Sequence, residues 1–373
     1  MATGAPTPTV MHVIPGLGSG GAEGMLAALV TAKRTEPLSQ VVVNLVPEGV
    51  NAGRIRTAGV PLHNLGLTNP AMGGRILYEL TGLIRRYRPA AIQSWLYLGD
   101  LTALWALHLA RRRSSTRLYW GVRGSYLNLS DYNFNLRMVM KLCNWQSRAP
   151  DAVIANSFAG RDDHLRMGYR PRAFGVIPNG IDIDRFRPDA DARARIRAEL
   201  GIAESRPTVI HAARNDPMKD HDTLFAVAAQ LPHATFVLAG VDTEKLHGPG
   251  NVISLGTRRD MPALFAAADA AVLTSIYGEG FPNVIAEAMA CGTPVVATDC
   301  GDAGRIVSST GTITPPRDVS AFTAALRAIL DESSEQRRRR AETCRTRIKD
   351  HFSLDRTVAA FDALHRHGTL PTD

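Results

Sequence analysis

The sequence predicts an α/β protein made of two doubly wound, Rossmann-like domains in tandem, facing each other across a cleft. Three observations lead to this prediction. The chain of 373 residues is too long for one ordinary hydrophobic core. Short, near-continuous apolar runs alternate with helical stretches, which is typical of βαβ units and a parallel sheet. The alternation then starts again after about residue 190. We therefore expect domains over residues 1–190 and 191–352.

In the first half, a strand at 9–14 leads through a glycine-rich loop into a helix at 22–34. A second helix is expected at 101–113. The remaining strands of this half are expected at 40–46, 90–95, 117–123, 151–157 and 173–180. Each is short and almost wholly apolar, as strands buried on both faces of a parallel sheet are.

The second half opens with a charged, proline-containing segment, Arg185 to Leu200, which suits a linker and a first helix. Strands are expected at 208–214, 235–240, 251–256, 270–275 and 293–299, and helices at 221–231, 261–268 and 283–292. Pro282 suits the first turn of the last of these helices, where its missing N–H is not needed. Gly292 is placed to end that helix.

Composition limits the classes of function. The chain is 45% hydrophobic and 21% charged, and no apolar run approaches the roughly 18 residues of a membrane span. Four scattered cysteines indicate reduced thiols in a cytosolic protein. The net charge of +8 divides into +10 for residues 1–190 (22 Lys/Arg, 12 Asp/Glu) and −2 for residues 191–373 (21 and 23). A basic half indicates either an anionic partner or a solvated surface; no nucleic-acid motif accompanies it, so nucleic acid is not expected.

The first loop raises one alternative function. Gly16, Gly18 and Gly21 spell the G-x-G-x-x-G of a dinucleotide-binding turn. An NAD site also needs an acidic residue at the end of the second strand, about 20 residues further on. The nearest acidic residue, Glu48, lies beyond Pro47 and past the end of that strand. An NAD-dependent oxidoreductase is therefore a poor fit.

The second half contains two cations and two carboxylates that are candidate ligand-binding residues. Arg214 and Lys219 follow a strand and could bracket a pyrophosphate, the guanidinium as a planar fork and the ammonium as a point charge. Glu279 and Glu287 lie eight positions apart around a helix start. A helix N-terminus suits a phosphate or a sugar hydroxyl, and two carboxylates can accept hydrogen bonds from a polyhydroxyl group. The alternative is an ordinary surface loop with solvated charges.

Several strings together resemble the family 4 glycosyltransferases of the GT-B fold. They are the glycine loop, "VIPNGIDIDRF", "ARNDPMKDHDTL", "LGTRRDMPALFAAADAAVLTS", "EGFPNVIAEAMACGTPVVATD" and "FSLDRTVAAFDAL", and they follow in the family's order over nearly the whole chain. The resemblance implies a retaining transfer of a sugar from a nucleoside-diphosphate sugar, such as a UDP-sugar, to a hydroxyl of a glycan or a polyprenyl-linked acceptor. It also implies that the last helix, about 353–368, packs back onto the first domain.

The resemblance implies a role for each matching residue. Glu279 would contact the donor sugar and Glu287 the ribose hydroxyls, while Arg214 and Lys219 would hold the diphosphate. Gly20 and Gly21 of the first loop would close over the donor phosphate or the acceptor. The backbone amides of the segment from Gly280 to Val284 would cradle sugar and phosphate; its residues are Gly280, Phe281, Pro282, Asn283 and Val284.

The chain departs from the family's pattern in the first domain. Many members have a His near the end of a strand there, but "WGVRGSY" has Arg123, and "SWLYLGD" has no His after Tyr97. Arg123 could steady a donor hydroxyl or the leaving diphosphate, bind an anionic acceptor, or be a bystander. Asp182 and Asp184 resemble a metal-binding D-x-D but belong to the "NGIDIDRF" string, so no metal is expected.

The expected place of action is the cytoplasm, with peripheral contact to an anionic membrane at its inner face, in surface polysaccharide or glycoconjugate biosynthesis. Two other functions on the same fold remain open. One is a nucleotide-sugar epimerase or phosphorylase, and the other is a non-catalytic binder of sugar nucleotides.

Overall fold

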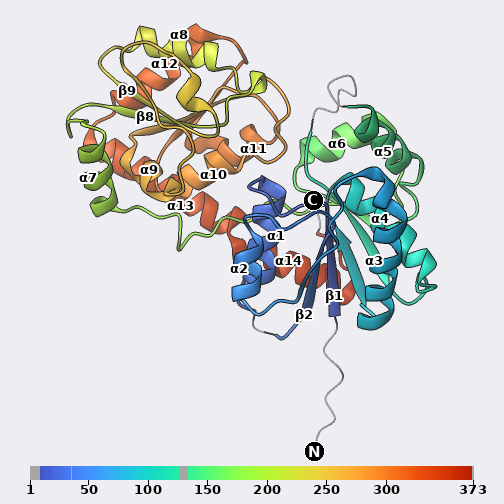
Figure 1. Cartoon of the computed structure of the whole chain (residues 1–373). Coiled ribbons are helices and arrows are strands. Elements are labelled where there is room, and N and C mark those ends of the chain that lie inside the picture. The colour runs from blue at the N-terminus through green and yellow to red at the C-terminus, as the bar shows by residue number, and fades with distance from the viewer. Residues whose placement is uncertain (1–8, 35, 126–132, 372–373) are drawn as a thin grey trace, which may run out of the picture. The chain divides into compact units, whose positions relative to one another are not determined.

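The computed structural model of the chain describes residues 9–34, 36–125 and 133–371 and divides into two compact units (Figure 1). The first unit contains residues 1–180 and 354–373, and the second contains residues 181–353. The chain therefore changes unit after Gly180, not after residue 190 as the charged linker suggested. Among the helices of the described ranges, none combines the length and the apolar character needed to cross a membrane.

The first unit is built on a parallel sheet in the order β3-β2-β1-β4-β5-β6-β7. The strand order reverses between β1 and β4, which pair directly. In open α/β sheets a ligand crevice forms beyond the carboxyl ends of the strands at this point. The strands are β1 (Thr9–Ile14), β2 (Ser39–Asn44), β3 (Leu62–Asn64), β4 (Ala91–Ser94), β5 (Arg117–Val122), β6 (Ala152–Ala155) and β7 (Phe174–Val176).

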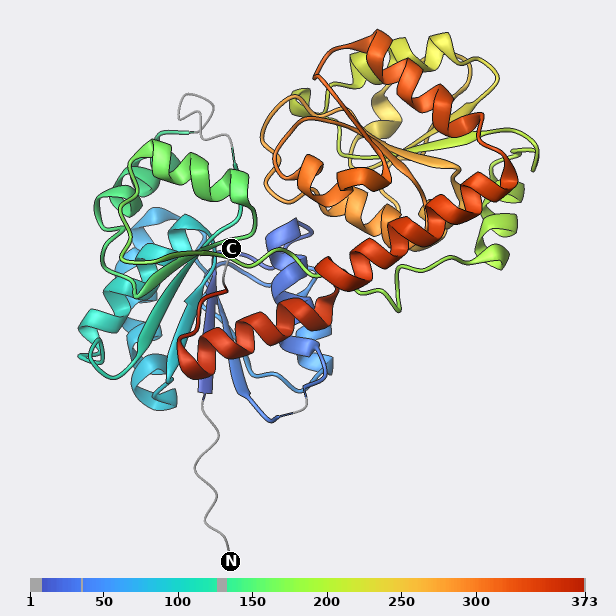
Figure 2. The same ribbon diagram turned by 180° about the vertical axis from the view of Figure 1, so that it is seen from behind.

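Helices cover both faces of this sheet. One face packs on α1 (Gly21–Thr31), α2 (Ala52–Thr57) and the C-terminal α14 (Leu354–His367); the other packs on α3 (Gly73–Tyr87), α4 (Leu96–Leu109) and α5 (Phe134–Trp145). A short η1 (Pro70–Met72) precedes α3, and α6 (Phe158–Met167) connects β6 to β7. Figure 2 shows α14 beside the sheet of this unit. Its Phe361 is fully buried and stacks on Trp95, with 6.0 Å between ring centroids.

The second unit repeats the plan with the sheet order β10-β9-β8-β11-β12-β13 and a reversal between β8 and β11. Its strands are β8 (Thr208–Ala212), β9 (Thr235–Ala239), β10 (Val252–Ser254), β11 (Ala270–Leu273), β12 (Val295–Thr298) and β13 (Thr312–Thr314). Its helices are α7 (Ala190–Glu199), η3 (Pro217–Lys219), α8 (His221–Gln230), η4 (Thr243–Lys245), α9 (Met261–Ala267), α10 (Asn283–Ala290), α11 (Ala303–Val307), η5 (Ser308–Thr310), α12 (Val319–Leu330) and α13 (Ser334–Phe352).

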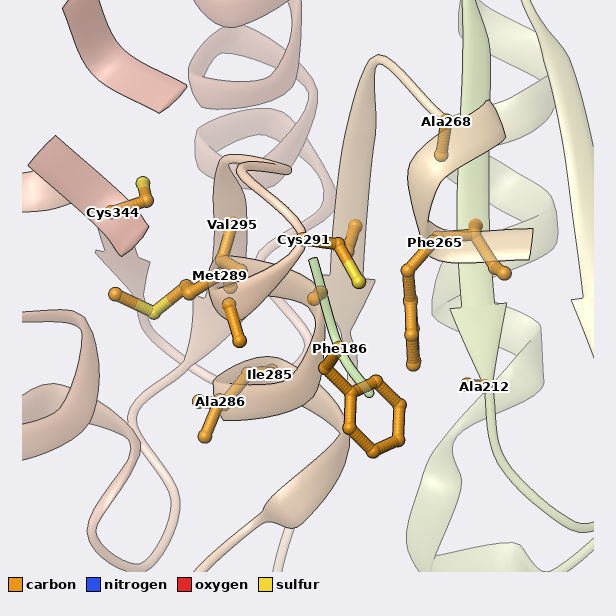
Figure 3. Close-up of a cluster of buried hydrophobic side chains, with 14 of the residues drawn as sticks. Phe186, Ala212, Phe265, Ala268, Ile285, Ala286, Met289, Cys291, Val295 and Cys344 are labelled. Atoms are coloured by element: carbon orange, nitrogen blue, oxygen red, sulfur yellow. The ribbon is translucent and has the colours of Figure 1, made fainter. Parts of the chain in front are cut away.

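The core of the second unit fixes the position of α10. Ile285 and Met289 of this helix are fully buried in a cluster with Phe186 and Phe265 (Figure 3). Burial of side chains of this size contributes about 1.5–3 kcal/mol each. The helix ends before Gly292, whose φ of +79° is the left-handed conformation that glycine adopts easily. The start of α10 is therefore held rigidly next to the end of β11.

Candidate functional site

Two loops of the second unit meet where the strand order reverses. One follows β8 and the other follows β11. The Thr274 hydroxyl donates to the carbonyl of Lys219 over 2.6 Å, and the Ile276 N–H donates to the carbonyl of Met218 over 2.9 Å. These bonds join the "RNDPMK" loop to the loop that enters α10. They place two predicted site residues, Lys219 and Glu279, side by side.

Lys219 and Glu279 form the centre of this site. The Lys219 ammonium is ion-paired with Oε1 of Glu279, and the Ser275 hydroxyl donates to the same oxygen over 2.7 Å. The two charged side chains are only 12% and 11% exposed. An ammonium has three N–H donors, and the pair with Glu279 uses one of them. The site thus holds a shielded cation and a carboxylate whose direction is fixed.

Arg214 lies in the same loop but is held differently. Its side chain is 57% exposed and bonds the Asp216 carboxylate, with 2.9 Å from Nε and 2.7 Å from Nη2. Asp216 also accepts the Met218 N–H over 3.0 Å, which caps the turn before Lys219. Partial burial raises the pKa of Asp216, but the Met218 N–H and the Arg214 guanidinium outweigh it and hold that pKa below its ordinary value. Arg214 therefore pairs with a carboxylate of its own loop.

The segment from Gly280 to Val284 forms the entry to α10. Phe281 is buried and packs on Phe352 with 5.5 Å between ring centroids. The first N–H groups of a helix have no acceptor within the helix, and they carry the positive end of its dipole. The carbonyl of Gly280 accepts the Asp302 N–H over 2.9 Å. Gly301 lies so close that a Cβ there would be 2.1 Å from the Glu279 carbonyl oxygen. The loop has little freedom to move.

Glu287 lies one turn into α10. Its burial raises the pKa of the carboxyl to about 7, although Arg185 acts in the opposite direction. At neutral pH this group therefore exchanges a proton readily. A carboxyl of this kind can either donate to or accept from a sugar hydroxyl. The structure places Glu287 on the helix that follows Glu279.

In the first unit, the glycine loop lies after β1 at the β1–β4 reversal. Gly20 is the N-cap of α1, and Gly21 is the first residue of the helix. The Glu23 carboxylate bends back over this start: a Cβ on Gly20 would lie 2.4 Å from Glu23 Oε2. The helix start thus already faces a carboxylate of its own first turn. A phosphate approaching Gly20 has to displace the Glu23 side chain.

Arg123, at the end of β5, lies against aromatic rings. Its guanidinium carbon lies 4.2 Å from the Trp95 ring and 5.6 Å from the Phe361 ring. All three of its nitrogens are buried, and none has a hydrogen-bond partner within the described ranges. Burial lowers the pKa of this guanidinium to about 9, although Asp100 acts in the opposite direction. A buried cation in this state is costly unless an anion joins it.

Four of these groups were not predicted as site residues from the sequence: Ser275, Thr274, Asp216 and Trp95. Asp216 had a signal, because an Asp followed by Pro is typical of a helical turn start. Ser275 and Thr274 had a weaker one, since they end a buried strand at the carboxyl edge of the sheet. Trp95 carried no signal of a polar role.

The residues of the possible NAD site and of the D-x-D motif have other contacts. Glu48 is ion-paired with Arg56, and Asn44 ends β2 where an NAD site needs an acid. Asp182 accepts the N–H groups of Asp184 and Arg185 over 3.2 and 3.0 Å, which makes it the cap of a turn. In the described part of the chain, no three His, Cys, Asp or Glu side chains are grouped so that they could hold a metal ion.

Two family models match the chain one after the other. Residues 24–185 match the model described as Glycosyltransferase Family 4, and residues 192–347 match the one described as Glycosyl transferases group 1. D-inositol 3-phosphate glycosyltransferase of Mycobacterium tuberculosis is 31% identical over 239 residues, which cover 58% of this chain and 48% of that protein. The chain spans about half the length of the curated relatives it matches.

Solved structures share the fold over nearly the whole chain. HepE of Anabaena in complex with UDP and glucose has a TM-score of 0.80 at 22% identity, covering 95% of this chain and 98% of that one. A glycosyltransferase from Rickettsia africae has a TM-score of 0.82 at 16% identity, covering 97% and 98%. At these identities the likeness shows the GT-B fold. From the two family models and this fold, we conclude that the chain belongs to the family 4, group 1 glycosyltransferases.

Proposed function

We propose that this protein transfers a sugar, with retention of anomeric configuration, from a UDP-sugar to a hydroxyl of a glycan or lipid-linked acceptor. The observation that carries the proposal is the Lys219–Glu279–Ser275 cluster at the strand reversal of the second unit. It sets a shielded cation and an oriented carboxylate beside the start of α10. A diphosphate and a sugar need this combination of groups.

In the proposed reaction, charge on the leaving diphosphate is stabilised by Lys219, Arg214 and the first N–H groups of α10. Glu279 holds a hydroxyl of the donor sugar, and Glu287 holds the ribose. The acceptor hydroxyl attacks from the face that the diphosphate leaves, and a phosphate oxygen takes its proton, so retention needs no protein nucleophile. On this scheme the cations do the work that a metal ion does in other transferases.

The first unit would supply the acceptor side. An anionic group on the acceptor, such as the diphosphate of a lipid carrier, would give Arg123 the hydrogen-bond partner that it lacks among the described residues. The name of the mycobacterial relative gives it a phosphorylated acceptor, which agrees with this assignment. Gly20 and Gly21 would close over the ligand after Glu23 moves aside. We place the enzyme at the cytoplasmic face of the membrane, in surface polysaccharide or glycoconjugate biosynthesis.

A thermal-shift screen of UDP, GDP and their sugars tests the donor assignment. A ligand at 100 times its Kd stabilises a protein by about 2.7 kcal/mol. We expect UDP and UDP-sugars to raise the melting temperature of the wild type, and Lys219→Ala to remove most of the rise. Lys349→Glu, on the surface of α13, is the control. A wild type that responds to NAD instead would refute the proposal.

Product analysis separates transfer from the other activities. Incubation with the donor alone should leave it intact, whereas adding a lipid-diphosphate acceptor should release UDP and a product with the donor's anomeric configuration. Epimerised donor would indicate an epimerase, and a sugar phosphate would indicate a phosphorylase. Binding without turnover over a panel of such acceptors would indicate a non-catalytic binder.

A further inference from the structure

Helix α5 carries a row of large side chains on the face turned away from the core of its unit. Phe134, Met138, Lys141 and Trp145 are separated by four, three and four residues, which puts them on one side of an α-helix. Phe134 is 67% exposed, Met138 41% and Trp145 80%, whereas Cys143 on the opposite side is buried. The solvent face of a surface helix is normally polar. The solvent side of α5 instead carries three large apolar side chains beside Lys141.

The row continues onto α4. Trp105 is 38% exposed, and Leu109, one turn later, is 55% exposed. The Trp105 indole N–H donates to the side chain of Gln146 over 3.2 Å, next to Trp145, so the two helices present one surface. We call this surface the α4–α5 face; it consists of Trp105, Leu109, Phe134, Met138 and Trp145. Contiguous exposed apolar surface of this kind indicates an interaction site.

The α4–α5 face lies in a strongly basic part of the sequence. Residues 101–150 hold eight Lys/Arg and one acidic residue, Asp131, which lies outside the described ranges. This segment alone accounts for +7 of the +10 of residues 1–190. Arg137 and Lys141 are on α5 itself, and Arg148 follows it; the carboxyl of α4, Asp100, is fully buried. Two of these cations are not available at the surface, because Arg113 is paired with Asp151 and the nitrogens of Arg123 are buried. Arg111, Lys141 and Arg148 are exposed and Arg137 is partly exposed, so four surface cations accompany the apolar row.

We propose that the α4–α5 face docks on a bilayer that contains anionic lipid, with Phe134 and Trp145 in the interface and the cations against the headgroups. Tryptophan favours the membrane–water interface, and basic residues are attracted to anionic leaflets. A second copy of this chain is a poorer partner, because two faces of the same charge repel. The inference rests on the proposed function only where it links the membrane to a lipid-linked acceptor.

Vesicle flotation of the full-length chain, without nucleotide, tests the proposal. We expect the protein to float with vesicles of phosphatidylglycerol and phosphatidylcholine in equal parts and not with phosphatidylcholine alone. Raising the salt should weaken binding, since the screening length falls from about 8 Å at physiological salt to about 3 Å at 1 M. Each basic residue near an anionic surface strengthens binding about fivefold. The double variant R137E/K141E should therefore bind at least about 25-fold more weakly.

Matched variants separate docking from misfolding. F134S/W145S should bind at least about tenfold more weakly, because each side chain loses apolar contact with the interface. The controls are Tyr78→Ser, which removes an aromatic side chain on α3 that is 79% exposed, and Lys349→Glu on the second unit. Both controls should float like the wild type. All variants should keep the wild-type melting temperature.

The proposal fails if the wild type does not bind the anionic vesicles, or if the controls lose as much binding as the face variants. It also fails if F134S/W145S abolishes a dimer in solution and leaves flotation unchanged, since the face then binds a second copy. The thermal shift with UDP is measured on the same samples. Flotation without any response to UDP would refute the proposed donor and leave the docking face standing.

Discussion

Lys219→Ala should destabilise the ligand-free second unit as well as abolish turnover. The substitution leaves the Glu279 carboxylate, whose side chain is only 11% exposed, without the ammonium that neutralises it. Removing one partner of a buried ion pair costs about 3–5 kcal/mol; we take the lower figure, about 3 kcal/mol, because the pair is slightly exposed. For a unit of this size, each kcal/mol lowers the melting temperature by about 2–4 °C. The expected loss is about 6–12 °C.

A double variant separates the effect of losing the ammonium beside Glu279 from the effect of lost packing. Lys219→Met with Glu279→Gln removes both charges and keeps similar volumes, so it should melt within about 3 °C of the wild type. Both proteins should still lose at least about 10²-fold in turnover, because the diphosphate loses a transition-state donor. Differential scanning calorimetry without ligand gives the melting temperatures. UDP release in the presence of acceptor gives the rates.

Two results would contradict this reasoning. If Lys219→Ala melts with the wild type, the ion pair does not form in solution. If the double variant is as unstable as the single one, the loss comes from packing of the lysine stem and not from the carboxylate. Near wild-type turnover in either variant would remove Lys219 from the proposed diphosphate site.

Further predictions concern Arg123, Glu287 and Gly301. Arg123→Met should raise the melting temperature while lowering transfer, because it removes a buried guanidinium without a described hydrogen-bond partner; a fall would mean that its stacking on Trp95 or its attraction to Asp100 is structural. Burial raises the pKa of Glu287 to about 7, so the folded state holds a proton that the unfolded state releases. Stability should therefore fall as pH rises from about 5 to 7. Calorimetry against pH should show a flatter curve for Glu287→Gln than for the wild type. Gly301→Ala should cost about 2 kcal/mol or more, since its φ is +60° and its Cβ would meet the Glu279 carbonyl; Gly304→Ala, whose Cβ has an ordinary contact at 3.9 Å, is the control.

Apolar periodicity was enough to predict the class of fold, because strands buried on both faces appear as continuous apolar runs. It missed β3 and β13, which have only three residues each and lie at the edges of their sheets. The edge strands β7 and β10 are equally short and were predicted, so length and position alone do not explain the difference. In β3, His63 and Asn64 follow Leu62, and in β13 Ile313 lies between two threonines, so neither strand has the continuous apolar run on which the prediction depended. The change of unit near Gly180 was also missed. It depends on tertiary contacts, and the charged segment that suggested residue 190 lies just after it.

The candidate site was predictable in part for a similar reason. Lys219 and Glu279 are 60 residues apart in sequence, yet each follows a strand at the reversal point, so the topology alone brings their loops together. Topology does not determine which partner each side chain takes. Arg214 bonds Asp216 in its own loop, and Ser275 completes the Glu279 cluster. Which hydrogen bonds form depends on local distances of about 3 Å, which a sequence pattern does not encode.

Lys219 of the second unit has an ion-pair partner, whereas Arg123 of the first unit has none of its nitrogens in a described hydrogen bond. This difference affects how much stability each unit gains when a ligand binds. Lys219 is neutralised in advance by Glu279, so the ligand-free second unit carries little electrostatic strain at this point. The nitrogens of Arg123 are buried without a hydrogen-bond partner in the described ranges, although Asp100 is a charged neighbour, so the first unit gives up stability that an incoming anion can restore. An anionic acceptor should therefore stabilise the first unit strongly relative to its contact area. Because this gain needs a buried negative charge, a neutral analogue of the acceptor should not reproduce it.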